Sequence, residues 1–384
     1  MNTSSVMFAL LRSVFQQKEL EKTMKEELSP AVFCEIDTLA QKHDLGHLIA
    51  QAMENNGLFL DEPIAKKFLA KRSMAVYRVE QIEYELSEIC ATLDEAEIEY
   101  VPLKGALIRR YYPENWYRTC CDIDLLVQEE KLKDAVEILE TRLGYVNHGK
   151  GYHDVSMSSP SGVHLELHFN LLENQANIDG LLSKVWEYTQ KVEGSFRREM
   201  RGEFLLFHII AHASYHFIKG GCGVRPILDL YILEKNMPYD KEQLAVMLRE
   251  CRLAKFHEGL LALSSAWFDG EPLKEEFQGV ERYVLNGGVY GTLENRITVG
   301  QAQSGGKIRY FFRRLFMPYQ DLKAFYPSLA GKKWLTPFYQ IRRWGRLIFC
   351  GRLKKSMREF NINASLEKGE NLRVKEMMQT LELL

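Results

Sequence analysis

Asp122 and Asp124 lie two positions apart in the segment Asp-Ile-Asp-Leu-Leu-Val, so on a β-strand both carboxylates would leave the same face. Neighbouring carboxylates repel unless a divalent cation lies between them, and Mg²⁺ prefers such oxygen ligands together with water and phosphate oxygens. A later strand-like segment places His164, Glu166 and His168 on one face. Glu166 could supply the third carboxylate of two-metal phosphoryl transfer, with His168 as a substrate contact. The spacing predicts a Mg²⁺ (or Mn²⁺) site held by Asp122, Asp124 and Glu166.

Residues upstream of these carboxylates could contact phosphate groups. Lys104-Gly105 joins a strand-like segment to a short helix, where glycine lets backbone approach a phosphate and the lysine adds a cation. Arg118 is a second candidate for a phosphate contact. Each feature alone has a simpler explanation, because an Asp-x-Asp pair can face solvent at a strand edge and Lys-Gly can cap a helix. Their combined order along the chain favours phosphoryl transfer.

These segments resemble a family of uncharacterised bacterial nucleotidyltransferases within the polymerase-β-like nucleotidyltransferase superfamily. The resemblance covers about residues 35–260 and rests on Leu103-Lys104-Gly105-Ala106, Tyr111-Tyr112-Pro113, Arg118, Asp122-Ile123-Asp124-Leu125-Leu126-Val127 and Leu165-Glu166-Leu167-His168. It implies that Asp122 and Asp124 bind Mg²⁺ and that Glu166 completes the triad. The first motif is Lys-Gly where the superfamily usually has Gly-Gly or Gly-Ser, so we expect different contacts to the triphosphate.

Three histidines recur at intervals of four, which stacks them along one face of a helix: His208, His212 and His216. Two of them with Asp229 could bind zinc, but the His-Glu-x-x-His pattern of zinc hydrolases is missing. Histidines hydrogen-bonded in the core or beside a substrate are the simpler explanation. The family resemblance implies a third role, in which His212, His216, Arg225 and Asp229 belong to a helical domain that closes over the site. Arg225 would then contact phosphate or acceptor, and Asp229 or His212 would orient them or assist proton transfer.

The hydrophobic pattern predicts the elements that position these residues. Apolar residues recur at threes and fours up to about residue 95, as is typical of helices. Four strand-like segments follow, at 98–103, 123–127, 155–158 and 163–169, with a helix that Gly144 ends between the second and third. Helical patterns return from residue 177 to about 266, and the glycine-rich residues 280–306 are typical of a linker.

The sequence therefore predicts an α+β protein, mostly helical, with a small mixed-sheet nucleotidyltransferase core of the polymerase-β-like kind embedded among helices. We expect four regions: an N-terminal helical region (1–95), the α/β core (96–175), a helical domain closing the active site (176–280) and a basic aromatic C-terminal region (281–384).

Charge is distributed unevenly along the chain. Residues 301–360 carry fourteen Lys and Arg against Asp321 and Glu359, although the whole chain has a net charge of −2, so the preceding residues are acidic. Aromatic residues alternate with these cations. Such a surface suits the acidic part of the same chain, an anionic membrane surface or a nucleic acid. Docking within the chain is the simplest of the three, and membrane-surface association is the second.

The remaining composition bounds the location and function. No segment reaches the roughly 20 apolar residues of a membrane span, and seven scattered cysteines without a Cys-x-x-Cys pair indicate a reducing compartment. We expect a cytoplasmic protein that is at most peripheral to the inner membrane face. The leading hypothesis is transfer of a nucleoside monophosphate from an NTP to an unidentified small-molecule, sugar or protein acceptor. Alternatives are a non-catalytic nucleotide-binding or assembly protein in surface-polysaccharide or peptide biosynthesis, and a zinc hydrolase using either His164, Glu166 and His168 or the three histidines of the helix.

Overall fold

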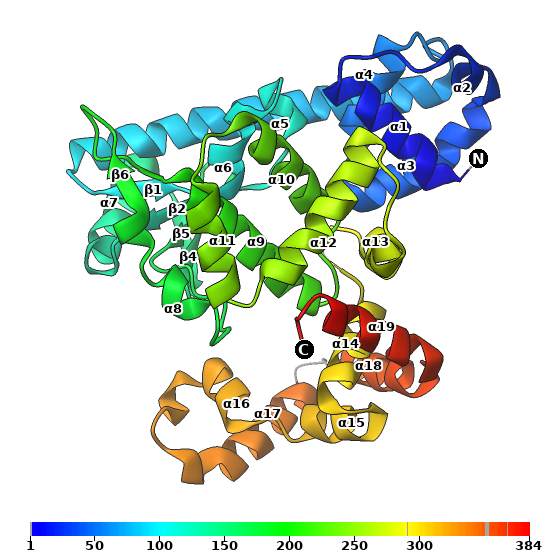
Figure 1. Cartoon of the computed structure of the whole chain (residues 1–384). Coiled ribbons are helices and arrows are strands. Elements are labelled where there is room, and N and C mark those ends of the chain that lie inside the picture. The colour runs from blue at the N-terminus through cyan, green and yellow to red at the C-terminus, as the bar shows by residue number, and fades with distance from the viewer. Residues whose placement is uncertain (1, 290, 350–352, 367) are drawn as a thin grey trace. The chain divides into compact units, whose positions relative to one another are not determined.

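The computed structural model describes residues 2–289, 291–349, 353–366 and 368–384 (Figure 1). These residues form two compact units, the first made of Met1–Tyr215 with Val224–Glu275 and the second of His216–Gly223 with Glu276–Leu384. Cys350, one of the seven cysteines, lies outside the described residues.

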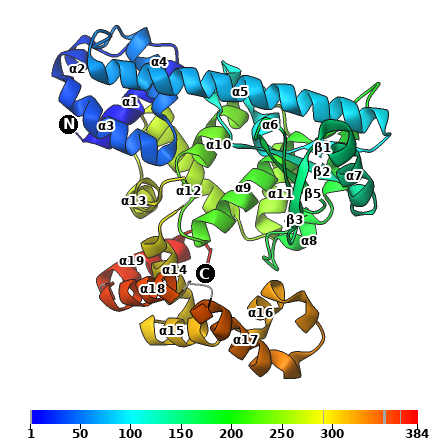
Figure 2. The same ribbon diagram turned by 180° about the vertical axis from the view of Figure 1, so that it is seen from behind.

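Helices lead the chain into its sheet, as the hydrophobic pattern predicts. They are α1 (Thr3–Phe15), α2 (Lys22–Glu27), α3 (Pro30–His43), α4 (Gly46–Asn55) and α5 (Pro63–Glu95). The 33-residue α5 begins at Pro63, whose fixed φ suits a first helical turn. Its length allows it to pack on α4 near one end and on β2 and α7 near the other (Figures 1 and 2). This helix therefore connects the N-terminal helices to the sheet.

Five strands of the described chain form one mixed sheet in the order β1-β2-β5-β4-β3. They are β1 (Tyr100–Pro102), β2 (Asp122–Val127), β3 (Val146–Lys150), β4 (Asp154–Ser158) and β5 (His164–His168). Strands β2 and β5 run parallel, and the other neighbours are antiparallel. The predicted small mixed sheet among helices is thus confirmed. The hydrophobic pattern does not predict β3, because all its residues are exposed at the sheet edge and no buried face marks it.

The two faces of the sheet have different chemistry. Ile123 and Leu165 belong to the buried core that one face forms with α5 and with α7 (Leu132–Leu143). The C-terminus of α7 lies where the sequence predicts it, because Gly144 adopts a left-handed φ of 69°. Side chains alternate along a strand, so the opposite face carries the carboxylates and histidines predicted for the site.

The rest of the first unit supports this second face. A short helix, α6 (Lys104–Ile108), joins β1 to the 3-10 turns before β2. After the sheet come α8 (Asp179–Leu182), β6 (Thr189–Lys191), β7 (Arg198–Met200), α9 (Gly202–Ile218), α10 (Arg225–Asn236), α11 (Lys241–Glu250) and α12 (Ala254–Ser264). The continuous helical prediction from residue 177 is wrong at the β6–β7 hairpin, whose short polar strands carry no hydrophobic alternation.

The second unit is helical where the structure describes it. It contains α13 (Gln278–Gly287), α14 (Leu293–Ser304), α15 (Lys307–Leu315), α16 (Tyr319–Phe325), α17 (Thr336–Phe349), α18 (Leu353–Ser365) and α19 (Lys368–Thr380). The linker predicted at 280–306 is wrong, because α13 and α14 occupy most of it, and its glycines other than Gly300 lie at or between the ends of helices. Gly288 and Gly305 take positive φ there. None of the described helices is both long and apolar enough to cross a membrane.

Candidate functional site

The parallel register of β2 and β5 joins two motifs that lie far apart in the sequence. Asp122 is opposite His164, and Asp124 is opposite Glu166. Opposite residues of neighbouring strands point to the same face, so the Asp-x-Asp pair and Glu166 share one surface of the sheet. The pairing of β2 with β5 therefore decides which acidic groups meet.

Asp124, Glu166 and His168 form a compact group of possible metal ligands. One ligand atom from each lies within 4.8 Å of the others, and the described residues contain no second group of this kind. His168 Nε2 is 3.0 Å from Asp124 Oδ1 and 3.5 Å from Glu166 Oε2. Asp122 is not a member of this group, whereas His168, predicted as a substrate contact, is. The group could hold a divalent metal ion.

Electrostatics distinguish the three carboxylates. Burial opposes ionisation of Asp124, but the charge of Lys104 and the hydrogen bond from His168 outweigh it and hold the Asp124 pKa well below its usual range. The hydrogen bond with His168 lowers the pKa of Glu166. Burial and repulsion from Asp124 and Glu166 raise the pKa of Asp122. The site thus concentrates negative charge that a bound cation would compensate.

His168 holds the carboxylates in place. Burial lowers the pKa of its imidazole, but hydrogen bonds to Asp124 and Glu166 outweigh burial and raise it. The ring of His153, in the loop before β4, stacks on the His168 ring with centroids 5.4 Å apart and planes 12° apart. His168 Nδ1 is buried without a hydrogen-bond partner among the described residues. The two carboxylates therefore shift the His168 imidazole towards its protonated form.

Lys104 approaches the same group from the turn after β1. Its Nζ lies 3.8 Å from Asp124 Oδ1. Its φ of 36° is unusual for a residue with a side chain, and such strain concentrates at functional sites. The neighbouring Leu103 N–H donates to the Asp124 carbonyl over 3.0 Å. Gly105 packs closely on the segment before β2, because a Cβ there would lie 3.0 Å from Cys120 Cβ.

The histidine helix is α9. His212 Nδ1 lies 2.6 Å from Glu173 Oε1. Burial and the nearby charge of Lys104 lower the pKa of His208 to about 3, so this imidazole is neutral. His216 begins the segment that belongs to the second unit. Among the residues described, the helix contributes no ligand to a metal-binding group. His212 is instead hydrogen-bonded to Glu173, as in the simpler explanation given above for these histidines.

Arg118 and Asp229 form a buried ion pair. Arg118 Nε donates to Asp229 Oδ1 over 2.6 Å, and Arg118 Nη2 donates to Oδ2 over 2.9 Å. Tyr112 OH donates to Asp229 Oδ1 over 2.6 Å. Arg118 Nη1 donates to the Thr119 carbonyl. The guanidinium of Arg118, predicted to contact a phosphate, thus connects the segment before β2 to Asp229 on α10. The Asp229 carboxylate accepts hydrogen bonds from both Arg118 and Tyr112.

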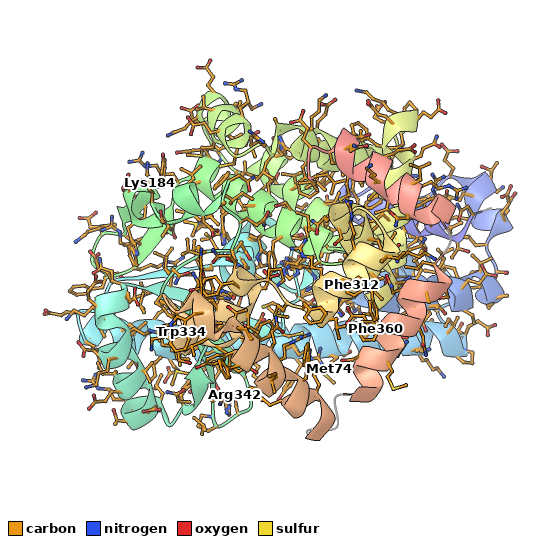
Figure 3. All side chains as sticks on the ribbon, turned by 90° about the horizontal axis from the view of Figure 1, so that it is seen from below. Met74, Lys184, Phe312, Trp334, Arg342 and Phe360 are labelled. Atoms are coloured by element: carbon orange, nitrogen blue, oxygen red, sulfur yellow. The ribbon has the colours of Figure 1, made fainter. Side chains whose placement is uncertain are left out.

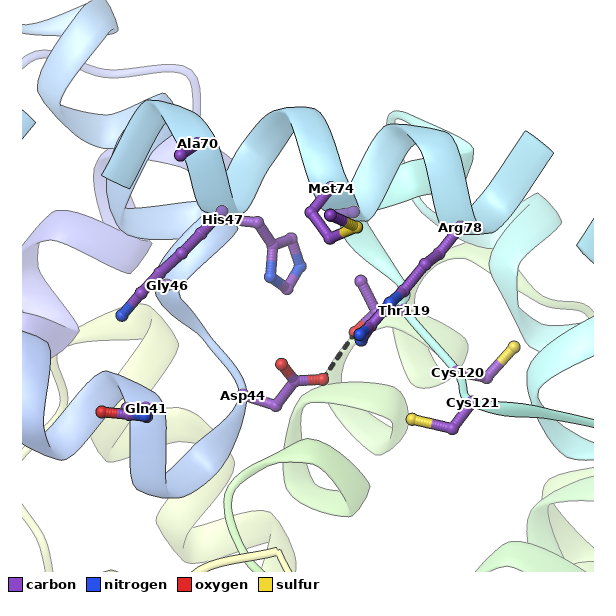
Figure 4. Close-up of a pocket in the computed structure, with 12 residues that line it drawn as sticks. Gln41, Asp44, Gly46, His47, Ala70, Met74, Arg78, Thr119, Cys120 and Cys121 are labelled. Atoms are coloured by element: carbon purple, nitrogen blue, oxygen red, sulfur yellow. Dashed lines mark hydrogen bonds between the residues drawn. The ribbon is translucent and has the colours of Figure 1, made fainter. Parts of the chain in front are cut away.

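A pocket of about 330 Å³ adjoins the start of β2 (Figure 4). Helices α3 to α5 and residues 119–121 line it. Arg225 Nη2 contacts Asp44, and Thr119 Oγ1 donates to Asp44 over 3.0 Å at the pocket wall. Arg78 extends from α5 towards Asp44 and Thr119 (Figure 4). No described side chain is paired with the Arg78 guanidinium. Cys121 also lines the pocket, directly before Asp122 in the chain.

Sequence patterns do not mark several residues that build the site. His153 and Glu173 come from irregular segments flanking strands, where periodicity carries no signal. Asp44 takes a left-handed φ of 54° at the end of α3 and becomes a partner of Arg225 only through tertiary packing. Tyr112 lies in a motif that carries the family resemblance, but its contact with Asp229 is visible only in the structure.

A family model described as uncharacterised nucleotidyltransferase matches residues 33–269. A crystal structure of an antigenic nucleotidyltransferase-like protein from Paracoccidioides brasiliensis is similar at 16% identity over 50% of this chain and 92% of that chain, with a TM-score of 0.31 that supports no conclusion. No curated protein matches. The matched range includes the whole mixed sheet and the Asp124–Glu166–His168 group, and the chain belongs to this family of uncharacterised nucleotidyltransferases.

Proposed function

We propose that the protein transfers a nucleoside monophosphate from an NTP to an acceptor and releases pyrophosphate, using a polymerase-β-like nucleotidyltransferase core. The observation that carries the proposal is the meeting of Asp124 with Glu166 across two parallel strands, with Lys104 beside them, in a chain of a nucleotidyltransferase family. A small molecule, a sugar and a protein are all acceptors compatible with this chemistry.

The donor set fits a divalent cation. Asp124 and Glu166 offer carboxylate oxygens, and Asp122 adds a third carboxylate on the same face. These hard oxygen ligands suit Mg²⁺ and Mn²⁺. When bound, such a cation neutralises charge on the phosphates and polarises the transferred phosphoryl group. We assign its binding to Asp124, Glu166 and Asp122, with His168 orienting them.

The protein's own groups bind and orient the reactants. Lys104 Nζ, 3.8 Å from Asp124, is too far away for a hydrogen bond and keeps its donors for the phosphate oxygens of the NTP. Glu166 is ionised at neutral pH and partly exposed, so it accepts a hydrogen bond from the acceptor hydroxyl and takes its proton as the bond to phosphorus forms. His168 keeps both carboxylates aligned during this step.

We assign the acceptor to the pocket beside Cys121. Cys121, which lines the pocket, directly precedes Asp122 in the chain. An acceptor bound in this pocket would therefore lie next to the start of the strand that carries Asp122 and Asp124. Arg78 is a cation without a partner among the described side chains, so the pocket favours an acceptor that carries a carboxylate or phosphate. The exposed Met74 adds an apolar wall next to it.

The test is incubation of the purified full chain with each α-labelled NTP and Mg²⁺ or Mn²⁺, with and without cell extract. We expect label on an acceptor with the native chain and none with Asp124→Asn. Asp134→Asn, an exposed position on α7, is the matched control and should behave like the native chain. Absence of label with every NTP, or full labelling by Asp124→Asn, would overturn the proposal.

Metal analysis separates this function from zinc-dependent hydrolysis by His164, Glu166 and His168. His164 Nε2 lies 3.8 Å from Glu166 Oε1, whereas His168 is directed to Asp124 as well. We expect no zinc to remain after dialysis and Mn²⁺ to bind reversibly. One equivalent of zinc that survives dialysis would favour the hydrolase instead.

A further inference from the structure

Helix α15 presents an apolar row to solvent. Ile308 and Phe312 on the helix and Phe316, the residue that caps its C-terminus, follow each other at intervals of four and are 74%, 54% and 52% exposed. The opposite face is anchored, because Tyr310 is buried and its hydroxyl donates to Glu359 on α18 over 2.7 Å. The exposed row is therefore a fixed feature of a packed helix. Large apolar side chains that are gathered on a solvent-exposed surface in this way mark a binding site.

A second apolar row begins just before α17 and continues along it. Trp334, Phe338 and Ile341 lie at intervals of four and three and are 73%, 64% and 62% exposed. The other side of α17 is held by Gln340 Nε2, which donates to the Met317 carbonyl, and by Trp344 Nε1, which donates to the Leu315 carbonyl at the end of α15. The two rows thus belong to helices that contact each other.

Cations lie on the same helices as both rows, and the two carboxylates in the described part of residues 301–360 already have cationic partners. Glu359 accepts hydrogen bonds from Arg314 over 2.6 and 2.9 Å, and Asp321 lies 3.9 Å from Arg313. Exposed cations remain on the same helices and their connections: Arg309, Lys323, Lys332, Lys333, Arg342 and Arg346. We call these cations and the two apolar rows the basic-aromatic surface; Figure 3 labels Phe312, Trp334 and Arg342 on it.

We propose that the basic-aromatic surface binds an anionic phospholipid membrane, with the apolar rows entering the headgroup region and the cations contacting lipid phosphates. Rows that combine Ile308 and Ile341 with aromatic side chains offer hydrocarbon contact area along two helices, which suits lipid. An acidic protein surface, such as the acidic part of the same chain, would neutralise the cations but would give the apolar rows no comparable apolar environment. The bases of a single-stranded nucleic acid would stack on the aromatic rings but would make no comparable contact with the isoleucines. Charge and apolar rows together favour lipid.

Vesicle flotation of the full chain tests the proposal. We expect binding to vesicles of phosphatidylcholine with phosphatidylglycerol, weak binding to phosphatidylcholine alone, and weaker binding as salt is raised. The double variant Phe312→Ser, Trp334→Ser should lower the partition coefficient by at least about tenfold, since each side chain transfers a large apolar area. The matched control is Tyr77→Ser, Tyr84→Ser on α5, where both residues are 63% exposed; it should bind like the native chain.

Two further measurements test the cations and the apolar rows separately. Arg309→Glu, Arg346→Glu keeps the apolar rows and should lose binding to anionic vesicles. The Trp334 fluorescence should shift to shorter wavelength with anionic vesicles, and Trp334→Phe should remove that shift while keeping most binding. Unchanged circular dichroism would show that each variant folds. No binding of the native chain to anionic vesicles, equal binding by the double variant, or binding to single-stranded RNA that excludes vesicles would overturn the proposal.

Discussion

His168 Nε2 lies 3.0 Å from Asp124 Oδ1, although 44 positions separate the two residues in the chain. The parallel pairing of β2 with β5 puts them on one face, and Lys104 reaches the same carboxylate oxygen from the turn after β1. Asp124 therefore has both Lys104 and His168 as neighbours. This makes Asp124 the group on which the proposed chemistry depends most directly.

Replacing Asp124 should abolish cation binding as well as transfer. Asp124→Asn removes a buried charge that compensates both Lys104 and a bound cation, so we expect a fall in NMP transfer of at least about a thousandfold. Mn²⁺ binding measured by electron paramagnetic resonance should fall with it. Asp134→Asn should retain both. Normal Mn²⁺ affinity in Asp124→Asn would show that the cation is held elsewhere.

The buried pair of Arg118 and Asp229 should contribute to stability. Asp229→Ala leaves the Arg118 guanidinium buried with no carboxylate, which costs about 3–5 kcal/mol of unfolding free energy. The double variant Arg118→Met, Asp229→Leu should lose less than the sum of the single variants, because neither charge is then left alone. Urea unfolding followed by far-UV circular dichroism measures these differences. A loss in Asp229→Ala below about 1 kcal/mol would contradict a structural role for the pair.

The pH dependence of stability should reveal Glu359. Burial opposes its ionisation, but hydrogen bonds from Arg314 and Tyr310 outweigh burial and lower its pKa. A lowered folded-state pKa stabilises the fold above the unfolded-state pKa of about 4.3, and this contribution is lost as pH falls towards the folded value. Glu359→Gln should therefore be less stable than the native chain by about 2 kcal/mol between pH 5 and 7.5. The gap should narrow below about pH 4.3; a gap that grows on acidification would contradict this assignment.

Cys121 offers a direct measure of the pocket. Its thiol is exposed and lines the pocket beside Asp122, so a bound reactant should shield it from iodoacetamide. A ligand at ten times its Kd leaves about a tenth of the molecules free, which predicts about tenfold slower alkylation. Cys34 is exposed on α3 and should react at an unchanged rate, as measured by peptide mass spectrometry. Equal rates at Cys121 with and without a reactant known to bind would place that reactant elsewhere.

The sequence by itself determined the local framework of the site. The apolar run Ile123 to Val127, interrupted by Asp124, and the segment around Glu166 predicted two strands with polar groups on one face, and both strands are present. Gly144 marked a helix end correctly, because a left-handed cap is a local requirement that glycine meets. Such signals depend on a few neighbouring residues and can be read without knowing the fold.

Only the tertiary structure decided which groups meet. Arg118 and Asp229 are 111 positions apart, and their pairing results from the packing of α10 against the segment before β2. His168 joins Asp124 because β2 pairs with β5 in one particular parallel register. No local pattern encodes the choice of strand partner, since it depends on burying one whole face of the sheet against α5 and α7. The sequence indicated carboxylate chemistry, and the packing of distant segments determined its arrangement.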